Sequence, residues 1–370
     1  KSHGYRTGIV GKWHLGLDFT RLPQKQSNSD AGNAAAQDKK KKKKRRRAAA
    51  PRLDFSKPIL DGPNRRGFHD SLVIPASLDF PPYVYIRNTT ITSTDPVLQP
   101  AVKFPGFLRR GPRGRDLVMA NCLDDLKKHA ITFLEQRARE PETPFFLYFP
   151  LTAPHKPVLP HPRFRGRTRL GPYGDFIVQV DDTVGAILDA IDANKLTENT
   201  LIIYLGDNGS PVEVCTIRHH HDLVCGGKGL TVDRGTHVPL ICNWPGSIPV
   251  GSVNDDLIDC CDYLPTMLEA AGVPVPDGYY MDGRSFLPQL QGKSGDPRDW
   301  IYFHFEPGGR NQRPPARFVR GKQWKLYDDG RLFDIQADNE EENAFMLDSD
   351  DAERATVRAE LEPVIAQMVK

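Results

Sequence analysis

Two amphipathic helices alternate with two short apolar runs in the middle of the chain, and this order constrains the fold more than any other feature. The first helix is predicted over 116–139, where one stripe carries Leu117, Leu123, Leu126, Ala130, Ile131 and Leu134. The second is predicted over 173–194, with Ile177, Val180, Val184, Ile187, Leu188 and Ile191 on its stripe. Each helix is followed by a run typical of a buried strand, FFLYFPL after the first and LIIYLG (201–206) after the second.

This alternation predicts an α/β domain with a mostly parallel sheet flanked by helices. In such sheets, ligands bind at the carboxyl ends of the strands. Both predicted strands lead into polar segments, APHKP (153–157) after the first and GDNGS (206–210) after the second. The sequence therefore predicts a site to which these two segments contribute.

The character of the sequence changes after residue 297. WIYFHFE, ARFVRG, WKLY and RLFDI are typical of short strands separated by turns, and 352–368 is an amphipathic helix. We predict a small C-terminal antiparallel sheet plus a helix packed against the main domain. The predicted organisation is a catalytic domain over 1–296, incomplete at its N-terminus, and a C-terminal subdomain over 297–370.

Composition limits the class of protein. The chain has 370 residues, of which 39% are hydrophobic and 26% charged, as in a soluble globular protein. No apolar run approaches the roughly 20 residues that span a bilayer. Nine consecutive basic residues at 39–47 lie inside a stretch, 20–52, that we interpret as a disordered insertion; a nuclear signal or a handle for polyanionic sugar is the weaker interpretation. A basic excess confined to one tract does not indicate a nucleic-acid partner.

The cysteines indicate neither a zinc site nor a disulfide framework. There are six, none with the CxxC spacing: Cys122, Cys215, Cys225, Cys242, Cys260 and Cys261. A single bridge between Cys215 and Cys225 stays open. Cysteine usage leaves the compartment undecided.

Several polar residues suit the binding of a tetrahedral anion. Asp207 and Asn208 offer hard oxygen ligands for Ca²⁺ or Mg²⁺. A cationic cluster is predicted from Lys12, His14, His155 and Lys228, each flanked by Gly or Pro. A divalent metal with two lysines and two histidines suits phosphate or sulfate. Taken singly, each motif is more often an ordinary turn or loop, and the three consecutive histidines at 219–221 are interpreted as a solvated loop.

Five segments together resemble the type I, formylglycine-dependent sulfatases, in particular the bacterial arylsulfatase-like members. GYRTGIVGKWHLG is similar to the family's second signature almost position by position, and GGKGLTVDRGTHVPLICNWPG to the segment with its second lysine. The resemblance covers nearly the whole chain outside 20–52, and its segments are 4–16, 65–88, 144–157, 200–210 and 226–246. It implies an alkaline-phosphatase-like fold and a sulfuric ester hydrolase.

The resemblance also implies a role for each candidate residue. Lys12 would bridge the nucleophile and the sulfate, and His14 would orient the nucleophile. His155 would stabilise or protonate the leaving oxygen, and Lys228 would hold sulfate oxygens. Asp207 and Asn208 would be two of the ligands of Ca²⁺, with Mg²⁺ as the second choice. The implied substrate is a sulfated small molecule or glycan, and the implied location of the full-length parent is periplasmic or secreted.

The sequence departs from the family in three places. It contains no C-x-P-x-R or S-x-P-x-R segment, from which the family makes formylglycine, and it lacks the family's N-terminal aspartates. Asp233-Arg234-Gly235 replaces the usual acidic-Gly-Gly step. We therefore expect an N-terminally truncated chain that is inactive alone. Two alternatives remain, a non-catalytic homologue that binds sulfated glycans and a phosphatase or phosphonate hydrolase of the alkaline phosphatase superfamily. The sequence does not indicate an oligomeric state.

Overall fold

The structure is a computed structural model that describes residues 1–23, 52–103, 106–217, 223–306, 314–347 and 351–368. Most of the predicted insertion at 20–52 and the histidines at 219–221 lie outside the described residues. The chain divides into two compact units, Lys1–Lys195 and Leu196–Lys370, and each is described by itself. The boundary predicted at 296/297 falls inside the second unit and stays a prediction.

A five-stranded mixed sheet forms the centre of the first unit, with the strand order β4-β3-β2-β1-β7. Its three core strands are parallel: β1 (Arg6–Lys12), β2 (Asp70–Ile74) and β7 (Phe145–Tyr148). Two short strands continue the sheet antiparallel, β3 (Ile86–Arg87) and β4 (Thr90–Ile91). Because β1, β2 and β7 run in the same direction, their carboxyl ends meet at one edge of this sheet.

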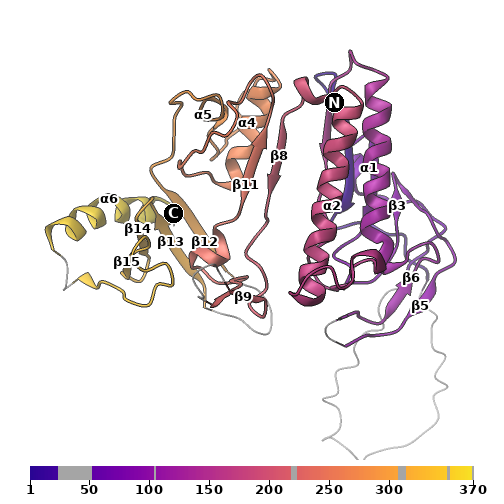
Figure 1. Cartoon of the computed structure of the whole chain (residues 1–370), viewed down its shortest axis with the longest axis horizontal. Helices are drawn as coiled ribbons and strands as arrows, with labels where there is room; N and C mark the ends of the chain where they lie inside the picture. The colour runs from indigo at the N-terminus through magenta and orange to yellow at the C-terminus, as the bar shows by residue number, and fades with distance from the viewer. Residues whose placement is uncertain (24–51, 104–105, 218–222, 307–313, 348–350, 369–370) are drawn as a thin grey trace, which may run out of the picture. The chain divides into compact units, whose positions relative to one another are not determined.

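The helices α1 (Cys122–Ala138) and α2 (Gly171–Ala193) pack side by side in the first unit (Figure 1). The apolar stripe of α1 faces the sheet: Leu126 and Ala130 belong to one core cluster with Val10 of β1 and Ile74 of β2. On the opposite face of the sheet, Ile9 and Val73 pack in a second cluster with Trp13, Phe55, Ile59, Val84, Ile86 and Ile91. Adjacent residues of β1 and β2 thus fill opposite faces, as strand geometry requires.

The remaining elements of the first unit are short. They are the hairpin strands β5 (Val97–Gln99) and β6 (Gly111–Arg113) and the 3₁₀ turns η1 (Pro63–Arg65), η2 (Met119–Asn121) and η3 (Pro162–Phe164). Most of 75–118 is irregular, in agreement with the Pro- and Gly-rich sequence.

The second unit begins with β8 (Ile202–Leu205), which pairs antiparallel with β11 (Leu240–Asn243). Between them lies a hairpin of β9 (Cys215–Ile217) and β10 (Leu223–Cys225), followed by the single helical turn α3 (Asp233–Thr236). The other short elements are η4 (Thr197–Asn199), η5 (Cys260–Asp262), α4 (Tyr263–Ala270) and α5 (Leu287–Leu290).

A four-stranded antiparallel sheet and a helix complete the second unit. The strands are β12 (Ile301–Phe305), β13 (Ala316–Arg320), β14 (Trp324–Tyr327) and β15 (Leu332–Asp334), and the helix is α6 (Ala352–Met368). Leu361 of α6 covers one face of the sheet through Val319, Leu326 and Leu332. Phe318, Tyr327, Phe333 and Ile335 pack together in a separate cluster.

Both predicted central helices, the C-terminal sheet and the C-terminal helix are confirmed. Two details differ. The core strand at 70–74 was not predicted, because DSLVI is short and surrounded by loop residues. The two predicted buried strands are only partly buried, with Tyr148 48% and Leu205 41% exposed, because β7 and β8 each pair with a neighbour on one side only among the described residues. None of the described helices is both long and apolar enough to cross a membrane.

A buried ion pair in the second unit gives a direct test of the fold. Asp262 and Arg298 have side chains that are 2% and 9% exposed, and Asp262 also accepts hydrogen bonds from the backbone N–H groups of Asp259 and Arg284. We expect Asp262→Ala to lower the free energy of unfolding by about 3–5 kcal/mol, because the buried guanidinium of Arg298 loses its carboxylate partner. Urea unfolding measures this. Asp296→Ala, at an exposed pair with Arg284, should lower the free energy of unfolding by no more than about 1 kcal/mol. An equal loss of stability in both variants would contradict the burial of the Asp262–Arg298 pair.

Candidate functional site

Lys12 lies at the carboxyl end of β1, held against the segment that follows β7. Its backbone N–H donates to the carbonyl of Pro150 (2.9 Å). The preceding residue, Gly11, has φ +135°, and a Cβ there would come within 2.0 Å of the Pro150 carbonyl oxygen. Only glycine permits this approach, since any side chain would separate the two strand ends. The half-buried Lys12 is thereby fixed at the edge where ligands bind in parallel sheets.

His14 follows as an exposed residue in the left-handed region, with φ +54°. Its backbone N–H donates to the carbonyl of Pro75, just after β2 (3.0 Å). Its ring lies 6.1 Å, centroid to centroid, from the ring of Phe80. A non-glycine residue at positive φ is uncommon and is maintained here by the hydrogen bond and by the neighbouring strand end.

His155 lies next to a buried carboxylate that the sequence analysis missed. Its Nδ1–H donates to the carbonyl of Lys156 (2.7 Å), and Nδ1 is 4.0 Å from Oδ1 of Asp79. Asp79 is 1% exposed; its Oδ2 pairs with Arg109 (2.6 Å), and its Oδ1 has no hydrogen-bond partner among the described residues. The guanidinium of Arg109 stacks 3.7 Å from the ring centroid of Phe80.

A series of contacts therefore connects the two predicted histidines of the first unit, His14 and His155. The Phe80 ring lies near the His14 ring and stacks against the Arg109 guanidinium. Arg109 pairs with Asp79, which lies beside His155. Asp79 lies in 65–88, one of the segments that resemble the family. Its partner Arg109 is thirty positions further along the chain, and no sequence pattern connects the two residues.

In the second unit, Lys228 lies against the segment that contains Asp207 and Asn208. The N–H of Lys228 donates to the carbonyl of Ser210 (2.9 Å), and the N–H of Gly209 donates to the carbonyl of Gly235 (3.1 Å). Lys228 and Asp207 are exposed, and Asn208 is half-buried. The structure thus places the backbone of Lys228 against Ser210, two residues after Asn208.

Glycines make this proximity possible. A Cβ at Gly209 would come within 2.0 Å of the Arg234 carbonyl oxygen, and a Cβ at Gly227 within 2.5 Å of the Arg234 carbonyl carbon. Side chains at these positions would push the strand end and the GGKG loop away from 233–235. Gly209 of GDNGS and Gly227 of GGKG therefore allow one backbone segment to pack directly against another.

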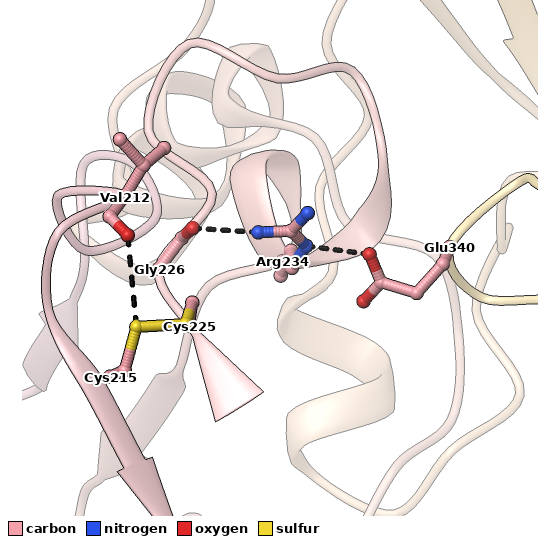
Figure 2. The surroundings of a disulfide bond; sticks show 6 residues. All are labelled: Val212, Cys215, Cys225, Gly226, Arg234 and Glu340. Atoms are coloured by element: carbon pink, nitrogen blue, oxygen red, sulfur yellow. Dashed lines mark hydrogen bonds and ion pairs between the residues drawn. A yellow bond between two sulfur atoms is a disulfide. The ribbon is translucent and has the colours of Figure 1, made fainter. Parts of the chain in front are cut away.

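A disulfide between Cys215 and Cys225 closes the β9–β10 hairpin immediately before Gly226 (Figure 2). The bridge that the sequence left open is therefore present.

The free thiols do not suit a nucleophile, since burial raises the pKa of Cys122 to about 12 and that of Cys242 to about 11.

The described residues do not by themselves fit a calcium ion. Ca²⁺ takes six to eight oxygen ligands, whereas Asp207 and Asn208 supply one carboxylate and one amide. Across the described ranges, no group of three or more His, Cys, Asp or Glu side chains is arranged to hold a metal. Lys12, His14 and His155 belong to the first unit, and Asp207, Asn208 and Lys228 to the second. The structure describes these two groups separately.

Comparison with known proteins assigns the family. The sulfatase family matches residues 1–273, and a family described as N-sulphoglucosamine sulphohydrolase, C-terminal, matches residues 227–370. The chain belongs to the sulfatase family. The resemblance found in the motifs is thereby confirmed.

Individual relatives agree with this assignment. The chain is similar to an N-acetylgalactosamine-6-O-sulfatase of Bacteroides thetaiotaomicron, with 25% identity over 93% of this chain and 71% of the relative. It is 29% identical to human arylsulfatase A over 82% of this chain, and the match spans 52% of that protein, about half its length. A solved structure from work on glycosaminoglycan metabolism by Bacteroides thetaiotaomicron has a TM-score of 0.72 and 23% identity, covering 100% of this chain and 79% of that one. This last likeness confirms the predicted fold class.

The close packing around Gly227 can be tested by adding one methyl group. We expect Gly227→Ala to lower the free energy of unfolding by about 1–3 kcal/mol, because its Cβ meets backbone atoms that cannot rotate away. Gly185→Ala is the matched control, since Gly185 lies in α2 with nothing within 4 Å of an added Cβ. It should stabilise the protein by about 0.5–1 kcal/mol. A neutral effect of Gly227→Ala in urea unfolding would refute the close approach.

Proposed function

We propose that this chain carries the sulfate-binding residues of a sulfuric ester hydrolase. One observation carries the proposal: the N–H of Lys228 donates to the carbonyl of Ser210, so that the GGKG loop is fixed against the segment that follows Asp207 and Asn208. Family membership supplies the chemistry, and Lys12, His14 and His155 of the first unit are the further candidate residues.

The proposed roles follow from charge. Sulfate transfer spreads negative charge over the equatorial and leaving oxygens, and the ammonium groups of Lys12 and Lys228 would stabilise it. Each such preorganised cation is worth roughly 2.7–4 kcal/mol, by analogy with an oxyanion-hole donor. His155 would hold a proton for the leaving oxygen at Nε2. Its Nδ1–H donates to the carbonyl of Lys156, and this hydrogen bond orients the ring.

We infer no nucleophilic step from these residues. Formylglycine would supply the nucleophile in the family, but the sequence has no C/S-x-P-x-R segment from which to form it. Ca²⁺, with Asp207 and Asn208 among its ligands, stays part of the proposal for the complete protein. We therefore propose that hydrolysis requires a nucleophile-bearing segment in addition to these residues.

A sulfated glycan is the substrate class that we propose. The relative from Bacteroides thetaiotaomicron is named for a sulfated amino sugar. Near the histidines, the ring of Phe80 is 41% exposed and Arg109 lies beside it, a combination that suits a sugar face and an anionic substituent. A periplasmic or secreted location is consistent with the disulfide at Cys215 and Cys225.

A non-catalytic protein that binds sulfated glycans is the second candidate. Arg234, which replaces a family glycine, favours it. The Arg234 side chain donates to the Gly226 carbonyl (2.8 Å) and to Glu340 (2.7 Å). The loop that carries Lys228 is therefore stabilised by a side chain that the family does not have at this position. A phosphatase is the third candidate, and it would turn over aryl phosphates faster than aryl sulfates.

The role of Lys228 is testable in a protein that includes the nucleophile segment. We expect Lys228→Ala to lower kcat for an aryl sulfate by about 10²-fold or more, because one cation is lost from the transition state. Lys293→Ala removes an exposed lysine of the same unit whose ammonium group donates to Gln291, and it should leave kcat unchanged.

The result separates the candidates. A loss below about tenfold in Lys228→Ala would count against the proposed role, since a direct transition-state contact costs more. Binding of sulfated sugar without turnover in the complete protein would favour the non-catalytic candidate. Faster turnover of aryl phosphate than of aryl sulfate would favour a phosphatase.

A further inference from the structure

A wholly buried lysine lies on β14 of the C-terminal sheet. Lys325 is 0% exposed, and its Nζ pairs with Glu341 (2.5 Å), whose side chain is 5% exposed. Burial lowers the pKa of Lys325, and Glu341 opposes that shift. The ammonium also lies 3.9 Å from the ring centroid of Phe318. A buried ion pair is costly unless its remaining donors are also satisfied, so the third contact of Lys325 is informative.

That third contact is with the loop that carries Lys228. Lys325 Nζ donates to the carbonyl of Thr231 (2.5 Å). The Tyr327 hydroxyl donates to Glu341 (2.5 Å) and accepts from the Thr231 hydroxyl (2.9 Å). Burial and the Glu341 carboxylate both raise the pKa of Tyr327. Thr231 is thus held at its carbonyl and at its hydroxyl by two residues of one strand, and we name Thr231, Lys325, Tyr327 and Glu341 the loop anchor.

Two further ion pairs fix the same loop to the same sheet region. Arg320 of β13 pairs with Asp233 (3.1 Å). Arg234 pairs with Glu340, next to Glu341, and also donates to the carbonyl of Gly226, as Figure 2 shows. The loop is therefore held at Gly226 before Lys228 and at 231–234 after it.

We propose that the C-terminal sheet sets the position of Lys228, and that Lys325 is a positioning residue for the binding of a sulfate group. Lys228 has only two residues between itself and Thr231, so a shift of the anchor moves the lysine. The directional contacts of a buried charge specify one loop position, which an apolar contact would not do. This inference rests on the proposed function of Lys228.

The test removes both charges of the anchor together. In Lys325→Met/Glu341→Gln, no buried charge is left unpaired, and such replacements are often neutral or stabilising, so the variant should fold. Calorimetry with inorganic sulfate measures affinity, and deuterium uptake measures opening of 226–236. We expect affinity to fall about tenfold, since small misplacements of a positioned group are costly, with faster exchange in 226–236.

Leu361→Ala is the matched control for a general loss of stability. Leu361 packs on the C-terminal sheet through Val319, Leu326 and Leu332, on the face opposite to Lys325 and Tyr327, since successive residues of a strand point to opposite faces. This variant should lower the midpoint of urea unfolding but keep sulfate affinity within about twofold of wild type, because it leaves the loop contacts in place.

Lys228→Ala, measured in parallel, separates the two claims. If Lys228→Ala loses sulfate affinity while the double variant binds like wild type, this inference is overturned and the proposed function stands. If Lys228→Ala binds sulfate like wild type, the proposed function fails, and this inference fails with it. Weaker binding in both, with Leu361→Ala unaffected, supports the positioning role.

Discussion

The approach of one backbone to another without intervening side chains is the constraint on which both groups of candidate residues depend. In the second unit, Gly209 and Gly227 both lie against the carbonyl of Arg234, at distances that no Cβ could occupy. In the first unit, Gly11 lies in the same way against Pro150. Because each glycine is next to or near a candidate site residue, the packing fixes Lys12 and Lys228 by their backbones.

Two charged residues close to the candidate site residues are buried. Asp79, buried beside His155, and Lys325, buried below the Lys228 loop, are both charged groups that a stable core does not require. Each contacts a residue that the proposal places at the sulfate ester or a neighbour of such a residue. Charges of this kind cost stability unless they are fully paired. Their placement is explained by what they hold in position.

The sequence predicted the parts of this protein that depend on local pattern. The 3.6-residue period revealed α1 and α2, and the C-terminal strands and helix were equally clear. Contacts between distant segments were out of reach: nothing in SLDF indicated that Asp79 would pair with Arg109. Lys325 is instructive, because in WKLY it has the appearance of a solvent-facing strand residue. It is buried only because the 231–234 loop and Glu341 cover it.

Protection of lysines from chemical labelling tests the central claim most directly, namely that Lys12 and Lys228 bind the sulfate group. The protein is labelled with an amine-reactive reagent over a titration of inorganic sulfate, and each lysine is quantified by mass spectrometry. The account predicts that Lys12 and Lys228 each become protected, while the exposed Lys293 and Lys322 do not change. Unchanged labelling of Lys12 and Lys228 at saturating sulfate would contradict it.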